Sequence, residues 1–260
     1  MDIKYKIKLF LLFVLPLVVL NSCLEEPTIP PVQRPFSVVR VGNFSMNLPG
    51  FSVFIDDAQP VAALSSLGKG TITGYFDVPS GKRVFKIVDA NNNTIFQKQI
   101  DIASFERVTV IFAGFYSTDE LQNTFGNFEF SGGEVYVDYS PESDSMSLIF
   151  VHASPDSPTE ATKKMYVTAK YKPAGSADFR DTVLIPSTSL LEYSTIQGLG
   201  NVAPGDFVIQ AREEVTGAIL VSDSSAYNAN MIYYIFFYDQ PNNIQILRNE
   251  TVPPPVRSKN

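Results

Sequence analysis

The chain of 260 residues contains no tryptophan, one cysteine and one histidine. With a single cysteine no intrachain disulfide can form, so the fold has to be stabilised by its hydrophobic core. The core is well supplied, because 45% of the residues are hydrophobic. With one histidine and one cysteine, the usual four-ligand structural zinc site cannot be assembled, and no metal or cofactor is expected. The lack of tryptophan also weakens the case for a sugar-binding surface.

The N-terminus has the pattern of an export signal. Three lysines precede an apolar run from Leu9 to Leu20, which has the length of a secretory signal core and is shorter than the ~20 residues that span a bilayer. Residues 20–23 read LNSC and resemble the lipobox of bacterial lipoproteins. The resemblance implies that residues 1–22 are cleaved as a signal peptide and that Cys23 is lipidated.

The residues after Cys23 indicate where such a lipoprotein would go. Leu24 in place of an aspartate resembles sorting to the outer membrane of a Gram-negative bacterium. Glu25 and Glu26 resemble a surface-export signal, or they are simply an acidic tether. Residues 23–35 are rich in proline and predict an extended stalk. We expect an outer-membrane lipoprotein, either periplasmic or exposed at the cell surface, with the surface favoured.

The charge of the exported part excludes one class of partner. Without residues 1–22, 17 basic and 26 acidic residues remain, a net charge of −9. Such a surface repels nucleic acid. The membrane, through the N-terminal lipid, and an unknown protein or glycan remain as expected partners.

The chain contains an internal repeat. Residues 74–81 read GYFDVPSG, and residues 198–205, at an offset of 124, read GLGNVAPG. The same offset without a gap places Val84 on Val208, Val108 on Ile232, Ile111 on Ile235 and Phe112 on Phe236. Two copies are too few for a solenoid, so each copy is expected to have its own core.

The pattern within each copy is that of short strands separated by turn residues. Asn91 to Asn93 and Val215 to Gly217 predict two equivalent hairpin turns. The expected fold is all-β, with two tandem antiparallel β-sandwich domains of the immunoglobulin-like type at residues 36–140 and 146–250. Residues 251–260 are expected to be a disordered tail.

The segment His152 to Pro158 reads HASPDSP and resembles the signature of the domain-of-unknown-function family 4397. The turn at Val78 to Gly81 is similar to that family as well. The first copy departs from the signature, since Val41 to Phe44 replace the His-Ala-Ser-Pro stretch. The resemblance covers most of residues 36–247 as two copies, and it implies extracytoplasmic, often tandem, β-rich domains of unsettled biochemistry.

His152 could be a catalytic residue, a metal ligand or a structural residue. No companion ligands for a metal exist in the sequence. Serine catalysis lacks the G-x-S-x-G pattern, and the motif places its serine, histidine and aspartate too close in sequence for a triad. We expect His152, Ser154, Pro155 and Asp156 to form a structural turn, and no catalytic residue is assigned.

Two further possibilities stay open and one is rejected. Among Asp56, Asp57, Asp138, Asp144 and Asp156, a carboxylate pair for hydrolysis needs a separation that the sequence does not give. Asp138, Glu142 and Asp144 offer oxygens for calcium, but a solvated linker is favoured because serine and proline surround them. Residues 198–203 fit G-x-G-x-x-A, but no helix follows that could receive a phosphate.

The aromatic run from Tyr233 to Tyr238 is the last candidate site. On a strand, Tyr234, Phe236 and Tyr238 share one face. They fill a core or an interdomain contact, or they form an exposed binding platform for a sugar or a protein. The sequence therefore predicts a non-enzymatic, lipid-anchored binding or cell-envelope interaction protein. Its alternative is a carbohydrate-binding module, and a glycan-active hydrolase is less favoured.

Overall fold

The computed structural model describes residues 35–131, 141–142, 144–156, 161–173 and 175–251. These residues form an all-β protein, as the sequence predicts, with the short 3-10 helix η1 (Ala62–Ser65). The chain from Pro35 onward forms one compact unit. The described residues contain no helix that could span a membrane.

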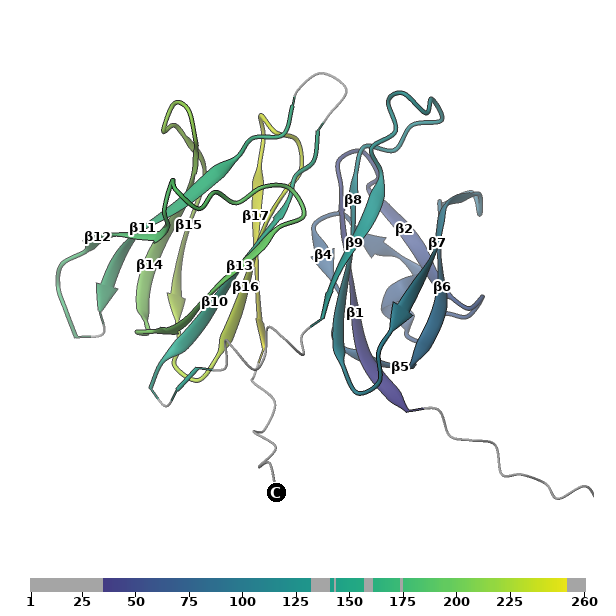
Figure 1. Ribbon diagram of the computed structural model, residues 1–260, viewed down its shortest axis with the longest axis horizontal. Coiled ribbons are helices and arrows are strands. Elements are labelled where there is room, and N and C mark those ends of the chain that lie inside the picture. Colours follow the sequence, from purple (N-terminus) through teal and green to yellow (C-terminus); the bar gives the residue numbers. More distant parts are fainter. Residues whose placement is uncertain (1–34, 132–140, 143, 157–160, 174, 252–260) are drawn as a thin grey trace, which may run out of the picture. The chain divides into compact units, whose positions relative to one another are not determined.

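The first half of the unit contains two sheets (Figure 1). One has the order β4-β1-β8-β9, with β5 also paired to β1, and the other has the order β3-β2-β6-β7. Their strands are β1 (Phe36–Ser45), β2 (Gly50–Ile55), β3 (Leu67–Gly68), β4 (Thr71–Ile72), β5 (Phe76–Pro79), β6 (Gly81–Val88), β7 (Thr94–Ile102), β8 (Arg107–Gly114) and β9 (Gly126–Ser131).

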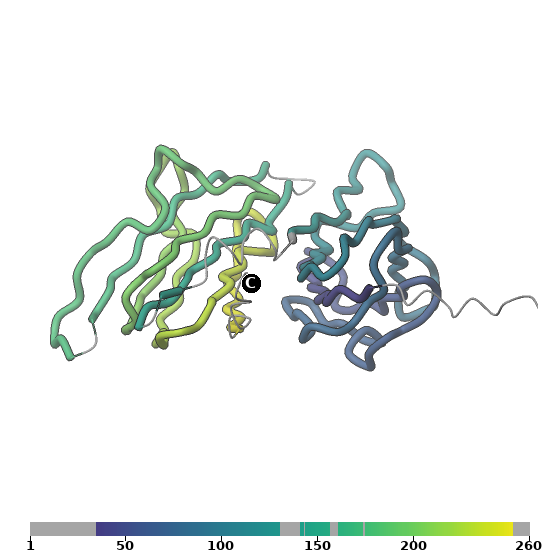
Figure 2. The backbone as a smooth tube through the Cα atoms, turned by 60° about the horizontal axis from the view of Figure 1, so that its bottom comes forward, coloured from purple at the N-terminus to yellow at the C-terminus, as the bar shows by residue number. Residues whose placement is uncertain are grey.

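The second half repeats this arrangement with sheets of the order β13-β10-β16-β17 and β12-β11-β14-β15. Among the described strands no ladder joins the two halves, and their tubes do not interleave in Figure 2. The strands are β10 (Met146–Ala153), β11 (Met165–Pro173), β12 (Arg180–Ile185), β13 (Ile196–Val202), β14 (Gly205–Glu213), β15 (Ile219–Tyr227), β16 (Ile232–Tyr238) and β17 (Gln245–Thr251). Thr251 thus belongs to a strand, although the sequence predicts that the tail begins there.

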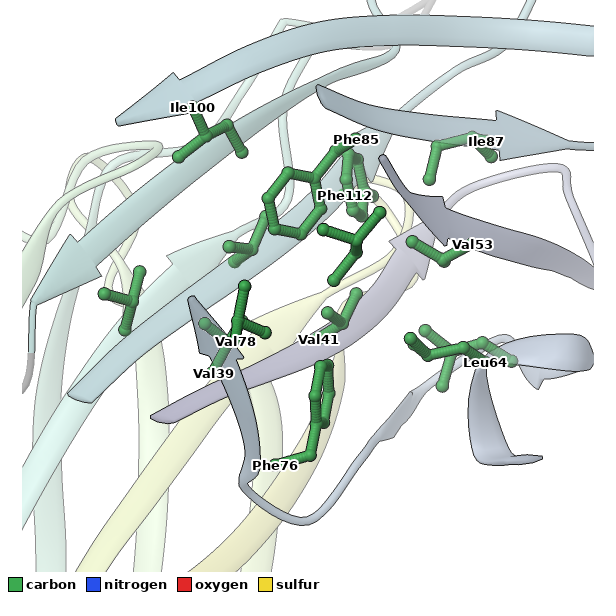
Figure 3. Packing of buried hydrophobic residues seen from close by; sticks show 14 of the residues in the cluster. Val39, Val41, Val53, Leu64, Phe76, Val78, Phe85, Ile87, Ile100 and Phe112 are labelled. Atoms are coloured by element: carbon green, nitrogen blue, oxygen red, sulfur yellow. The ribbon is translucent and has the colours of Figure 1, made fainter. Parts of the chain in front are cut away.

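Each half has its own hydrophobic core between its two sheets. In the first half, Val41 and Phe112 from one sheet meet Val53, Phe85 and Ile87 from the other (Figure 3). Because side chains alternate between the faces of a strand, every second residue of β1 and β8 enters this core. The second half is built in the same way around Phe150, Ile209 and Phe237.

One pair of strands in each half differs from the expected antiparallel pattern. β1 runs parallel to β8, and β10 runs parallel to β16. The hairpin between β6 and β7 belongs to the opposite sheet, so β8 reaches β1 through a crossover between sheets and not through a hairpin. Parallel neighbours require such a crossover. The sequence pattern shows that strands exist but not which of them become neighbours.

The internal repeat is present in the structure, but its register changes at the predicted hairpins. Ile87 of β6 pairs with Phe96, whereas Ala211 of β14 pairs with Val221. The offset between the copies is therefore 124 in the first strand of each hairpin and 125 in the second. Nine residues (212–220) separate Ala211 from Val221, whereas eight (88–95) separate Ile87 from Phe96, so the second hairpin contains one residue more between these paired positions.

The gapless alignment of the sequence is therefore wrong beyond the hairpins. Val108 and Phe112 lie in the first core, but their expected equivalents Ile232 and Phe236 point away from the second core. A register slip of one residue moves a side chain to the other face of a strand. The structural equivalent of Phe112 is Phe237, which lies in the second core.

The outward faces of β1, β8, β9, β10 and β16 form a third hydrophobic cluster, which joins the two halves. We call it the junction cluster, and its buried members are Phe44, Ile111, Ala113, Phe130, Ile149, Val151, Ala153, Ile232, Tyr234 and Phe236. The rings of Phe44 and Phe236 are stacked with their centres 5.0 Å apart. The rings of Phe130 and Tyr234 are stacked at 6.2 Å.

A buried arginine lies beside the junction cluster. Arg40 of β1 is 1% exposed, and its guanidinium lies 4.0 Å from the ring centre of Tyr234 in the second half. Its Nε donates to Thr109 Oγ1 at 2.9 Å, and its Nη1 donates to Asn249 Oδ1 at 2.7 Å. Stacking on an aromatic ring and hydrogen bonds to neutral acceptors lower the cost of burying this charge.

Replacing Phe236 with alanine tests the junction cluster. Because the side chain is fully buried and stacked on Phe44, we expect the free energy of unfolding to fall by about 3–5 kcal/mol. Chemical denaturation measures this change. Leu121→Ala, at a residue that is 97% exposed, is the control and should leave the unfolding midpoint in place. An unchanged midpoint for Phe236→Ala would mean that packing between the halves does not stabilise the fold.

Candidate functional site

The HASPD segment forms a corner at the end of β10. His152 is completely buried. Its Nδ1 accepts a hydrogen bond from the backbone N–H of Ser154 at 3.2 Å, and its Nε2 donates to the carbonyl oxygen of Lys163 at 2.9 Å. Both ring nitrogens are thus engaged by the backbone, and the proton is fixed on Nε2.

The environment of His152 keeps the ring neutral. Burial lowers the pKa of His152 to about 4, and the hydrogen bond to the Lys163 carbonyl offsets only part of this effect. The charged form of an imidazole is costly where water cannot reach it. At neutral pH the ring therefore neither carries a charge nor has a free nitrogen for proton transfer.

The other polar groups of the segment also contact backbone. Ser154 Oγ donates to the carbonyl oxygen of Asp239 at 2.6 Å, at the end of β16. Thr162 Oγ1 donates to the carbonyl oxygen of Ser154 at 2.6 Å, and the Thr162 N–H donates to the Asp156 carboxylate. Pro155 is buried between these contacts. The corner ties β10, β16 and residues 162–163 together, and Ser154 Oγ makes no hydrogen bond with His152.

The first half contains an equivalent corner that sequence alignment misses. Asn43 Oδ1 accepts from the N–H of Ser45 at 3.1 Å, and Asn43 Nδ2 donates to the carbonyl oxygen of Leu67 at 2.9 Å. The contact with Ser45 corresponds to that of His152 with Ser154, and the contact with Leu67 corresponds to that of His152 with Lys163. Asn43 and Ser45 are both fully buried, as His152 and Ser154 are.

The motif of the first copy is therefore displaced from its expected position. Alignment of the motif in the sequence places Val41 at the position of His152. In the structure, Asn43, two residues later, makes the equivalent hydrogen bond. The shared signal is a side chain with one donor and one acceptor, followed two residues later by serine. This pattern spans only three residues, and it is not detected in the sequence because the first copy has asparagine where the second has histidine.

The corner of the second half also reaches the first half. Asp239 is 7% exposed, has a positive φ of 80° and forms an ion pair with Lys69 at 2.8 Å. The carbonyl oxygen of Asp156 accepts from Thr124 Oγ1 at 3.2 Å. The position equivalent to Asp239 in the first half is Gly114, at the end of β8. Gly114 also has a positive φ, of 118°. A Cβ at Gly114 would lie 2.2 Å from the Thr124 carbonyl oxygen, so only glycine fits there.

The three aromatic residues predicted as a candidate binding surface do not form an exposed platform. Tyr234 and Phe236 have no exposed surface, because the first half covers that face of β16. Tyr238 is half-buried, and its ring lies 5.1 Å from that of Phe44. A strand at the centre of a sheet that is covered on both faces is apolar on both faces. This corrects the exposed-platform hypothesis in favour of packing between the halves.

The acidic candidates do not gather into a site in the described part of the chain. Asp56 pairs with Arg83 at 2.8 Å, and Asp57 pairs with Lys86. No group of three or more histidine, cysteine, aspartate or glutamate residues that could hold a metal ion is found among these residues. Asp138 and Cys23 lie outside the described residues.

One open pocket of about 460 Å³ lies in the second half. Among its described lining residues Asp206 is the single carboxylate, and Lys172 Nζ lies 3.9 Å from it. Ser176 adds a hydroxyl group and Asn228 adds an amide group. The described lining lacks the pair of facing carboxylates that glycoside hydrolysis requires.

Comparisons with known proteins agree with part of the sequence resemblance. Residues 37–159 match the family model of the Domain of unknown function (DUF4397). The match covers the first half and reaches the HASPD corner, and a second copy in the remaining residues stays a prediction. No curated protein matches the chain.

One solved structure aligns with most of the chain. It is described as a "putative cell adhesion protein" from Bacteroides uniformis, and it is 11% identical. The alignment covers 88% of this chain and 100% of the other, with a TM-score of 0.28.

Exchanging His152 for asparagine or alanine tests the corner. His152→Ala leaves the N–H of Ser154 and the carbonyl of Lys163 without partners, so we expect a loss of about 2–4 kcal/mol in unfolding free energy. His152→Asn restores the acceptor, as Asn43 does in the first half, and should cost about 1 kcal/mol less. Denaturant unfolding of both variants measures the difference. Equal losses for the two variants would contradict the equivalence of the corners.

The pKa of His152 also predicts a pH dependence of stability. The folded-state pKa of about 4 lies below the value of about 6.5 expected in the unfolded chain, so the unfolded state binds the proton first. The stabilisation is complete above pH 6.5 and is lost as the pH falls toward 4. At pH 5 the loss amounts to about 2 kcal/mol.

Unfolding midpoints of the wild type and His152→Asn at pH 7 and pH 5 test this effect. Because the chain has no other histidine, the difference between the two proteins isolates this residue from the carboxylates. We expect the wild type to lose more stability than the variant. Parallel curves for the two proteins would show that the folded state accommodates the charged ring.

Proposed function

We propose that this chain is a lipid-anchored, non-enzymatic binding protein of the cell envelope. The observation that carries the proposal is the use of the polar motif residues. His152, Ser154 and Asp156 hydrogen-bond to backbone groups, and His152 is buried and neutral. A catalytic site needs groups that can reach a substrate and exchange protons with it.

The anchor of this protein is Cys23, at the end of the export signal in the sequence. Each buried methylene of an acyl chain contributes about 0.8 kcal/mol, so the several chains of a lipoprotein hold it on the membrane almost permanently. The outer membrane is the proposed site, with the surface favoured over the periplasmic face because Glu25 and Glu26 follow the lipidated residue.

The binding surfaces would be loops and sheet edges. Leu121, in the loop between β8 and β9, is 97% exposed. Phe179 and Val183, in or beside the edge strand β12, are 48% and 60% exposed. An edge strand offers unpaired backbone groups to a partner. These features favour a protein partner over a glycan, since the aromatic residues that would form a sugar platform are buried.

Protease treatment of intact cells, with Cys23→Ala as the control, tests the proposal. We expect the wild type to be found in the membrane fraction and to be digested by external protease. Cys23→Ala should leave the membrane fraction, because the acyl chains are attached to that sulfur. Protection of a membrane-bound wild type would place the protein on the periplasmic face. Membrane association of Cys23→Ala equal to that of the wild type would contradict lipid anchoring.

A further inference from the structure

Two exposed phenylalanines lie on neighbouring segments at one end of the first half. Phe36, the first residue of β1, is 56% exposed, and Phe105, in the turn between β7 and β8, is 73% exposed. The segments that carry them are hydrogen-bonded to each other. The N–H of Val38 donates to the carbonyl oxygen of Glu106 at 2.9 Å, and the N–H of Glu106 donates to Ser37 Oγ at 3.3 Å.

The backbone presents Phe105 to solvent in a conformation that is uncommon for a large side chain. Phe105 has a φ of 63°, in the left-handed region. Residues with side chains enter this region at a cost of about 1–3 kcal/mol, and such positions cluster at functional sites. Folding alone does not account for a phenylalanine at this position, because asparagine or glycine is favoured in the left-handed region and an exposed ring gains little free energy from packing.

This end of the first half is also the end at which the chain arrives from its anchor. Figure 1 shows the start of β1 at the end of its sheet opposite the loop that follows β8. Twelve residues lead from Cys23 to Pro35, and a chain of that length spans at most about 40 Å. The anchor therefore keeps Phe36 near the bilayer, at a high effective concentration of membrane surface.

The charges beside the two rings allow an approach to a lipid surface. Glu106 and Arg107 directly follow Phe105 and are partly exposed, and exposed Lys82 of β6 pairs with exposed Asp101 of β7. Opposite charges on paired strands leave this end without a strong excess of either sign. Aromatic rings at such an end gain free energy in the interfacial region of a bilayer, where amphipathic proteins bury their apolar residues.

We propose that this end of the first half docks on the membrane surface, with Phe36 and Phe105 entering the lipid interface. The proposal rests on the proposed lipid anchor at Cys23. It adds that the anchored protein has a fixed membrane-facing end, which directs the loop between β8 and β9 away from the bilayer. β8 has 8 residues, so it separates Phe105 from that loop by about 26 Å.

The lack of tryptophan supplies a clean test. Phe105→Trp gives the lipidated full chain a single fluorescent indole, and Leu121→Trp gives a matched reporter beyond the opposite end of β8. Both proteins are reconstituted in phosphatidylcholine vesicles, with or without bromine on the acyl chains. We expect the emission of Trp at 105 to be blue-shifted and quenched by the brominated lipid, and that of Trp at 121 to be unaffected. Phe36→Trp serves as a second reporter where Phe105→Trp does not fold.

The outcomes separate this inference from the anchor itself. Co-flotation of the protein with vesicles reports the anchor, and quenching reports docking. Flotation without quenching at 105 and 36 would contradict docking of this end on the membrane while leaving the anchor in place. The two rings would then be expected to contact a protein partner. Equal quenching at 105 and 121 would overturn the fixed orientation. Loss of flotation in the wild type would instead overturn lipid anchoring.

Discussion

The arrangement depends on the burial of both faces of the central strand pair in each half. β1 with β8 and β10 with β16 place one face in their own core and the other in the junction cluster. Such strands are largely apolar on both faces, and neither outer face could be left in water without exposing a large hydrophobic patch. The two halves therefore bury these faces against each other. The aromatic run of β16 is a consequence of this constraint.

The corners at Asn43 and His152 act at the ends of the same strands. Each places a fully buried side chain with one donor and one acceptor where β1 or β10 ends. The backbone groups at these ends would otherwise be buried without partners, which costs more than the hydrogen bonds themselves contribute. The second corner continues to Asp239, whose ion pair with Lys69 connects it to the first half. The HASPD segment is thus used to terminate strands and to join the halves.

The sequence predicted the β-strand content and the hairpin turns, but not the pairing of the strands or the register between the two halves. Asn91 to Asn93 and Val215 to Gly217 lie in hairpin turns as predicted, because turn residues act locally. The parallel neighbours were missed, because pairing depends on where the chain crosses between sheets. The equivalence of Val108 with Ile232 failed, because one additional residue within the second hairpin changes the face of every later side chain. Asn43 was missed because its likeness to His152 lies in hydrogen bonds and not in residue type.

The sequence by itself determined the all-β class, a repeated strand pattern and the presence of a lipobox-like segment ending at Cys23. These properties follow from composition, from alternation and from short motifs, which act within a few residues. Only the tertiary structure decided that Tyr234 and Phe236 are buried and that His152 is held neutral by the backbone. The same holds for Phe36 and Phe105, which share one end of a sheet. Burial and proximity depend on segments far apart in the chain, and no local pattern records which segments will meet.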